Sequence, residues 1–460
     1  MSVTRKQILE GNIFKGIVAM AIPLMVLNLI NTLYGIVDTF FVEKIGELQV
    51  GAVSLVSPIA NCGVAFATGL SAAGIAMISQ SLGKGDKNKA NQIATHLIVL
   101  SIVLGILITC ICLLFNKPIL NWLNTPEDIY NDTLLYFIGV SFDYVCLFVL
   151  TMFQSIRQAS GDSKSGAVLN IIASIFNGCL DPLFIFVFKL GTLGAAIATV
   201  LSKVIVVPFA LYSLANKANP VYISLSESKI ELPIMNKIVS VAVPASLGSL
   251  LSSFGFVLMS KEIVSYGSII MSGYGIGSNI ANVFYIPINF IGSALPTFIG
   301  QNLGANNADR AKKRYVESIK IVAITSLIVI ALGYLTSKYI INIFVEDASA
   351  KLIDVSLEYA YYSITTAFFM GWFNSLCGVF NGSTNTKISM ILSASRILVI
   401  RMPIVWLLAR FTNLKYTGIW VSMIISNLII CISGQIIYNH YSWDKKSFLS
   451  LITLYKCYYL

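Results

Sequence analysis

Long apolar runs follow one another along this sequence, separated only by short polar connections. A helix needs about 20 apolar residues to cross the hydrocarbon core of a bilayer. The chain has 460 residues, of which 56% are hydrophobic and 11% are charged, whereas a soluble protein carries about 25% charged residues. A water-soluble globule of this composition would expose too much apolar surface. The sequence therefore predicts an all-α polytopic membrane protein.

The apolar runs predict twelve transmembrane helices. Their expected bounds are 16–42, 50–80, 91–115, 128–156, 163–188, 194–216, 235–263, 268–300, 311–337, 352–380, 387–410 and 417–440. Lysine and arginine are enriched in cytoplasmic loops. With the first residues inside, twenty of the 31 Lys and Arg residues fall on the inner side, eight on the outer side and three within spans. We therefore expect a multi-pass cell-membrane protein with both termini in the cytoplasm. The net charge of +10 would then meet anionic lipid, not nucleic acid.

The second half of the sequence repeats the first at a nearly constant offset. An offset of 221 residues aligns Pro23 with Pro244, Gly46 with Gly267, Gln80 with Gln301, Gly83 with Gly304, Gly161 with Gly382 and Pro182 with Pro403. An offset of 224 then aligns Gly194 with Gly418 and Ser202 with Ser426. We predict a duplicated six-helix unit: an N-lobe (1–214), a cytoplasmic linker (215–235) and a C-lobe (236–460). Since six is even, a pseudo-two-fold axis along the membrane normal relates the lobes, and a cavity between them suits alternating access.

Two aspartates lie within spans of the N-lobe, where ionisable groups are costly and mark functional sites. Asp38 and Asp181 fall at depths that differ by only about 5 Å, at 1.5 Å per residue. Other polar residues lie near them at helical spacing or at a similar depth: Asn31, Tyr34, Asn170, Ser174, Asn177 and Thr199, with Asn61 on a further polar stripe. The two carboxyl groups should hold a proton or neutralise a cation. Interhelical hydrogen bonding is the alternative role for Asn170 and Ser174, and for Asn61 and Thr68, which share a polar stripe.

The polarity of this group is confined to one lobe. The repeat aligns Asp38 with Met259 and Asp181 with Met402. This asymmetry favours an ion or proton site in the N-lobe alone. Methionines suit surfaces that accept varied ligands. Met259 and Met402 are therefore candidate cavity residues, together with Asn31, Asn61, Asn170 and Ser174.

Pro23 interrupts the hydrogen bonding of the first span and is a candidate hinge. The alternative is a static kink, since membrane helices tolerate proline.

The other charged residues within spans have no assigned role. Asp143, Arg396 and Arg401 remain open, and Lys203 would snorkel or pair locally. No nucleophile, base and acid are arranged for catalysis, and His96 and His440 lie at helix ends. We expect no enzyme activity, no cofactor and no resident metal ion.

Several segments carry a family resemblance. They are "IPLMVLNLINTLYGIVDTFFVEKIG", "SQSLGKGDKNKA", "RQASGDSKSGAVLNI", "NGCLDPLFIF", "LGTLGAAIATVLS" and "GQNLGANNADRAKK", and they resemble the multidrug and toxic compound extrusion (MATE) transporters. The resemblance implies two six-helix lobes that export cationic or amphipathic drugs, driven by inward flow of H+ or Na+. It is similar to the DinF-type prokaryotic branch, in which an N-lobe aspartate pair carries coupling. That resemblance places these residues in the coupling site, with Pro23 as the bending proline: Tyr34, Asp38, Asn177, Asp181 and Thr199.

The sequence departs from the NorM-type branch, which uses acidic residues in helices 7 and 10. Here those regions read "GSLLSSFG" and "FFMGWFNS", without an acid. A lipid-linked oligosaccharide flippase of the same superfamily is the first alternative, and an integral-membrane enzyme is the second. The expected partners are small-molecule drugs, H+ or Na+ and membrane lipids, with Na+ bound only transiently at Asp38 and Asp181. We expect a monomer.

Overall fold

The computed structural model describes residues 3–45, 47–123, 125–224, 230–344 and 349–441. Tyr34 and Asp38 fall within a helix, but their side chains lie outside the described part of the chain. Every regular element of the described residues is a helix.

The first half forms a short helix, α1, and then six spans, some made of two consecutive elements. The bounds are α1 (Arg5–Glu10), α2 (Ile13–Glu43), α3 (Glu47–Lys84), α4 (Lys87–Trp122), α5 (Glu127–Ser141) with α6 (Asp143–Ala159), α7 (Ser163–Pro182) with η1 (Leu183–Val187), and α8 (Gly191–Ala215).

The second half forms six further spans in the same order. The bounds are α9 (Leu232–Val264), α10 (Ser268–Gly304), α11 (Ala308–Phe344), α12 (Ala350–Thr365) with α13 (Ala367–Gly382), α14 (Thr386–Ala394) with η2 (Ser395–Arg401) and α15 (Met402–Phe411), and α16 (Thr417–Asn439).

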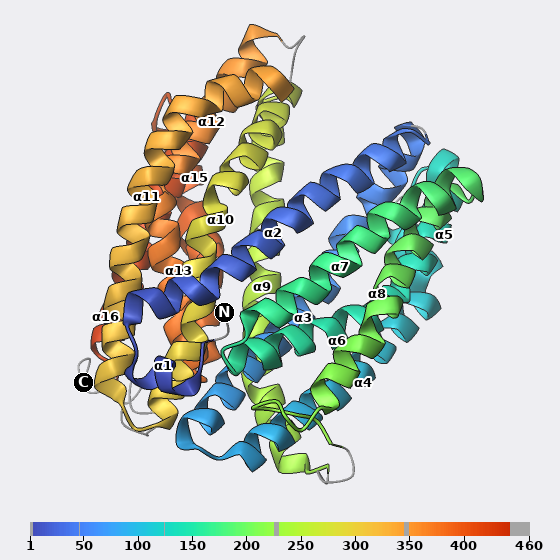
Figure 1. Cartoon of the computed structure of the whole chain (residues 1–460). Helices are drawn as coiled ribbons and strands as arrows, with labels where there is room; N and C mark the ends of the chain where they lie inside the picture. Colours follow the sequence, from blue (N-terminus) through green and yellow to red (C-terminus); the bar gives the residue numbers. More distant parts are fainter. Residues whose placement is uncertain (1–2, 46, 124, 225–229, 345–348, 442–460) are drawn as a thin grey trace, which may run out of the picture.

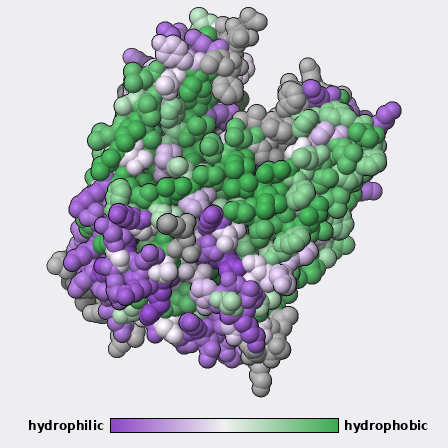
Figure 2. Space-filling view, in the orientation of Figure 1, coloured by the Kyte–Doolittle hydropathy of each residue, from purple (hydrophilic) through white to green (hydrophobic). Residues whose placement is uncertain are grey.

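The prediction of an all-helical polytopic membrane protein is confirmed. Among the described residues, eleven helices are long and apolar enough to cross a membrane, or twelve when the bent pair α12 and α13 counts as one span. A broad apolar zone covers the middle of the molecule, and hydrophilic residues gather below it (Figure 2). This division matches a protein whose helix surfaces contact lipid.

Helix ends extend past the apolar runs that predicted them. The third span was expected to begin at residue 91, but α4 begins at Lys87. There the Asp86 side chain accepts a hydrogen bond from the Lys89 amide over 3.0 Å. Capping satisfies the free amides at a helix start whatever the hydropathy of the first turn, so the helix continues into polar sequence.

The same two irregularities occur in each half. The fourth span breaks between α5 and α6, and its counterpart breaks by 47° between α12 and α13. The fifth span contains a π-helical stretch in both halves, η1 after Pro182 and η2 before Pro403. Proline lacks an amide hydrogen and crowds the carbonyl four residues back, which explains a local change of helix type.

The helices gather into two arms that meet at one end and diverge at the other (Figure 1). The arms meet where α3 packs against α9 and α10, and α2 contacts both α7 and α10. A hollow opens between the arms at the top of the space-filling view (Figure 2). The short helix α1 lies in the lower half of Figure 1.

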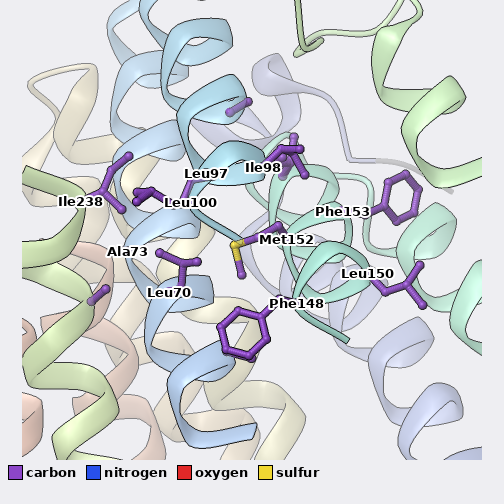
Figure 3. Close-up of a cluster of buried hydrophobic side chains, with 14 of the residues drawn as sticks. Leu70, Ala73, Leu97, Ile98, Leu100, Phe148, Leu150, Met152, Phe153 and Ile238 are labelled. Atoms are coloured by element: carbon purple, nitrogen blue, oxygen red, sulfur yellow. The ribbon is translucent and has the colours of Figure 1, made fainter. Parts of the chain in front are cut away.

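The core of the first arm lies where α3, α4 and α6 converge (Figure 3). Leu70, Leu97 and Phe148 bring one side chain from each of these helices, and all three are at most 2% exposed. Ile238 of α9 joins the same cluster. The second arm therefore takes part in the core of the first at this end of the molecule.

Candidate functional site

A fully buried carboxyl group of the first arm belongs to Asp181, at the end of α7. Its side chain is fully buried, and the neighbouring Asn177 is 3% exposed. Asn177 Nδ2 donates a hydrogen bond to Asp181 Oδ1 over 3.0 Å. The two residues are one helical turn apart and therefore share a face of α7. The helix ends one residue later, at Pro182, and η1 follows from Leu183.

Further polar side chains continue down the same face of α7 and join it to its neighbours. Ser174 Oγ donates to Asn31 Oδ1 of α2 over 3.2 Å. Asn170 Nδ2 donates to Gln154 Oε1 of α6 over 3.2 Å and to the Gly166 carbonyl over 2.9 Å. The structure thus brings Asn31 and Ser174 together, and the bond from Asn170 is of the interhelical kind that the sequence left as an alternative.

The remaining residues of the predicted coupling set are not joined to Asp181 by described contacts. Tyr34 and Asp38 lie on α2, which packs against α7, but their side chains are outside the described residues. Thr199 Oγ1 donates to the Ala195 carbonyl of its own helix over 3.0 Å. Asn61 is exposed on α3. The coupling role of these residues therefore remains a prediction.

The two methionines aligned with the aspartates pack in one apolar cluster of the second arm. Met259 is fully buried there, and Met402 is half-buried against it. Met259 Sδ lies 3.9 Å from Nη1 of Arg401. The equivalent region of the second arm therefore contains methionines and an arginine in place of carboxyl groups.

An ion pair inside the first arm was not assigned from the sequence. Lys203 Nζ lies 2.5 Å from Asp143 Oδ2, with side chains that are 24% and 10% exposed. Asp143 is the first residue after the break in the fourth span, and Lys203 lies on α8. The available signal was one charge of each sign, in the fourth and sixth spans, and pairing was one of the two alternatives for Lys203.

A cavity of about 310 Å³ lies between the two arms. Its lining comes from α3 on one side and from α9, α13 and α14 on the other: Thr68, Ala72, Ala245, Gly248, Ser249, Ser252, Phe373, Asn374, Cys377, Asn381, Ser389, Met390 and Ser393. Hydroxyl and amide groups predominate among its polar lining. Thr68 lies on the polar stripe of Asn61, but the predicted cavity residues themselves are not part of this lining.

Known proteins resemble this chain over 70% to 98% of its length. The "Probable multidrug resistance protein YoeA" of Bacillus subtilis is 23% identical over 98% of both chains. The "FAD transporter" of Shewanella oneidensis is 26% identical over 70% of this chain and 72% of its own. A crystal structure of "MATE in complex with MaL6" superposes with a TM-score of 0.88 and is 25% identical, covering 93% of this chain and 96% of that one.

The family model MatE matches residues 23–183 and 244–407, one segment in each half of the duplicated sequence. The two segments begin at Pro23 and Pro244, which the 221-residue offset aligns. Together they cover well over half of the chain. This match agrees with the two-armed helical fold, and the chain therefore belongs to the MatE family of membrane transporters.

Proposed function

We propose that this protein exports drug-like amphipathic compounds across the cell membrane, driven by inward flow of H+ or Na+. Family membership supports transport, and the names of relatives such as YoeA support multidrug compounds as substrates. The observation that carries the coupling proposal is the buried Asp181 carboxyl group with the Asn177 amide donating to it. A membrane-embedded carboxyl group is costly unless it binds a proton or a cation.

The proposed coupling site contains Asp38, Asp181, Asn177, Thr199 and Tyr34, as in the DinF-type branch that the sequence resembles. Asp38 lies on α2, which packs against the α7 helix that carries Asp181. A proton or a Na+ ion would enter this site from outside, and the drug would leave through the space between the arms. We further propose that residues 1–214 and 236–460 act as two lobes in alternating access, joined by the linker 215–235.

The proposed orientation has both termini in the cytoplasm and the hollow between the arms open to the outside. The excess of Lys and Arg in the loops assigned to the inner side supports it. We propose that the protein works as a monomer.

The decisive experiment is dye efflux in inverted vesicles with separate pH and Na+ gradients. Asp181→Asn and Asp38→Asn should each abolish gradient-driven efflux at normal expression, because they keep the size of the side chain and remove its charge. Met402→Leu and Met259→Leu, at the aligned positions of the C-lobe, should keep ion coupling intact. Wild-type coupling in either aspartate variant would remove that residue from the coupling site.

A further inference from the structure

Two arginines lie inside the C-lobe among neutral groups. Arg396 and Arg401 belong to η2 and are 6% and 2% exposed. Arg401 donates from Nε to Ser426 Oγ over 2.9 Å and from Nη2 to Asn427 Oδ1 over 3.0 Å. These hydrogen bonds satisfy much of the guanidinium group but do not neutralise its charge.

Arg396 has fewer polar contacts than Arg401. Its Nη1 lies 3.1 Å from Met370 Sδ, and its guanidinium carbon lies 4.7 Å from the centre of the Phe373 ring. Its Nε is buried and has no hydrogen-bond partner within the described part of the chain. No carboxylate among the described residues forms an ion pair with either arginine, and the two guanidinium groups are close enough to repel each other.

The depth of these charges makes the absence of an anion significant. Arg396 and Arg401 lie 10 and 15 residues beyond Thr386, at which α14 begins, so they are about 15 and 22 Å along the span. A positive charge near the middle of a bilayer is costly unless it is paired. At the equivalent level of the N-lobe the offset of 221 places Asp181 against Met402, the neighbour of Arg401. The two lobes thus carry opposite charges at matching depth.

Arg396 lies directly behind the wall of the cavity between the arms, and Arg401 follows five residues further along the same span. Phe373, on whose ring Arg396 stacks, lines that cavity, and so does Ser393, one helical turn before Arg396. The lining contains no charged side chain, so nothing there opposes the field of the guanidinium groups. In surroundings of low polarity such a field is weakly screened over a few ångströms.

We propose that the C-lobe wall of this cavity attracts the anionic group of an amphipathic substrate, a carboxylate or a phosphate. The inference rests on the proposed export function and names its substrate class. A zwitterionic compound suits both lobes, because its cationic part is attracted to the carboxyl groups of the N-lobe and its anionic part to Arg396 and Arg401. The protein therefore prefers such a zwitterion to a plain cation of the same shape.

A matched pair of dyes tests this preference. Rhodamine 110 carries a free carboxylate, and rhodamine 123 is its methyl ester, so that the two differ only at the anionic group. Equilibrium binding to the purified full-length protein in lipid nanodiscs is measured by fluorescence anisotropy. We expect the wild-type protein to bind the acid at least ten-fold more tightly than the ester.

The variants Arg396→Met and Arg401→Met should each weaken binding of the acid at least five-fold and change binding of the ester less than two-fold. Their neutral surroundings accept an apolar side chain of similar length, so the fold should be retained. Arg396→Lys, which keeps the charge, should retain most of the preference. Arg410→Met is the control: it removes an exposed arginine that stacks on Trp406, and it should change neither affinity.

Two results would overturn the inference. One is equal affinity of the wild-type protein for the ester and the acid. This result would reject the preference for the acid even if a variant fails to fold. The other is an equal loss of both dyes in the arginine variants, which would mean a structural role. Gradient-driven efflux of rhodamine 123 tests the export function separately. Efflux of the ester without a preference for the acid would reject the inference alone.

Discussion

Gln80 and Gln301, which the 221-residue offset aligns, form equivalent hydrogen bonds in opposite directions across the seam between the two arms. Gln80 Nε2 of α3 donates to the Gly382 carbonyl over 3.1 Å, and Gln301 Nε2 of α10 donates to the Ala159 carbonyl over 2.9 Å. Each acceptor lies at or near the end of a broken fourth span. These two aligned glutamines thus connect the arms where they meet, one bond donated from each arm.

Gly83 and Gly304 make this close approach of α3 and α10 feasible. A Cβ atom at Gly83 would lie 2.1 Å from the Gln301 carbonyl oxygen, and one at Gly304 would lie 2.1 Å from the Gln80 carbonyl oxygen. Gly304→Ala should therefore push the arms apart at the seam and destabilise the observed conformation by about 1–3 kcal/mol, as overpacking does. Distances between spin labels on the two arms would report the separation.

The control for this prediction is Gly178→Ala on α7, where an added Cβ meets no heavy atom within 4 Å. It should leave the spin-label distances unchanged. Equal distances in wild type and Gly304→Ala would show that the seam adapts without separating.

The ion pair between Lys203 and Asp143 should be important for stability. Lys203→Met leaves a mostly buried carboxylate without its cation, and we expect a loss of about 3 kcal/mol in the free energy of unfolding. The control is Lys320→Met, since Lys320 pairs with Glu317 on an exposed face, with side chains 63% and 32% exposed. Loss of that pair should cost less than about 1 kcal/mol. Unfolding in mixed micelles would measure both, and similar losses would contradict the prediction.

The positions of the spans could be predicted because a bilayer demands long apolar runs, and hydropathy reports these directly. The breaks near Phe142 and Thr366 could not, because no proline lies at either position and the apolar run resumes directly after each of them. The short helix α1 was also missed, since its signal is a capping box between Thr4 and Gln7 in polar sequence.

Only part of the candidate site could be predicted from the sequence, for a related reason. Spacing along one helix placed Asn177 beside Asp181, because residues four apart share a face. Contacts between helices depend on rotation and tilt, which composition does not encode. The surroundings of Arg396 and Arg401, and the partner of Lys203, therefore became clear only when the spans were packed together.

Asn177 should be needed for coupling because it donates to a buried carboxylate. Asn177→Leu keeps the side-chain size and removes a hydrogen bond to a charged group, which is worth about 1.5–3 kcal/mol. The cation-free state of the site, through which each transport cycle must pass, becomes less stable by that amount. We expect gradient-driven efflux to fall about ten-fold or more at equal expression.

The control for Asn177 is Ser101→Ala in α4. Ser101 is also buried, but its hydroxyl donates within its own helix, to the Ile98 carbonyl over 2.7 Å. Efflux by this variant should stay near the wild-type rate. Unchanged efflux in Asn177→Leu would mean that Asp181 needs no donor from this residue.

Pro23 should affect coupling more than its repeat partner Pro244. Both lie within long helices, α2 and α9, and each ring removes one backbone hydrogen bond. Asp38 lies 15 residues beyond Pro23, about 22 Å along α2, whereas Met259 occupies the same place after Pro244. Neutralising Asp38 would let the outer part of α2 repack about Pro23. Pro23→Ala should therefore reduce coupled efflux more than Pro244→Ala, and equal effects would reject the hinge.

The helix α1 connects the two arms at the end where they meet. Arg5 of α1 donates to the Leu82 and Gly83 carbonyls of α3 over 2.7 and 2.8 Å. From the other arm, Arg314 of α11 donates to the Ile8 carbonyl over 2.6 Å and to the Ile13 carbonyl over 3.0 Å. The Ile8 carbonyl lies in α1, and the Ile13 carbonyl lies just beyond it. Arg5 therefore binds α1 to α3, and Arg314 binds it to α11.

Arg314→Met should therefore free α1 and loosen the contact between the arms. The Arg314 side chain is fully buried and also stacks on Phe298, with 4.6 Å from the guanidinium carbon to the ring centre. Methionine keeps the apolar contact but leaves the carbonyls without their charged donor, at about 1–3 kcal/mol for each buried group. We expect faster hydrogen exchange of the amides of α1 and of the last turn of α3. Arg410→Met, which removes an exposed arginine, should not change this exchange. Unchanged exchange in Arg314→Met would show that the apolar contacts of Ile8 and Ile17 hold α1 without the arginine.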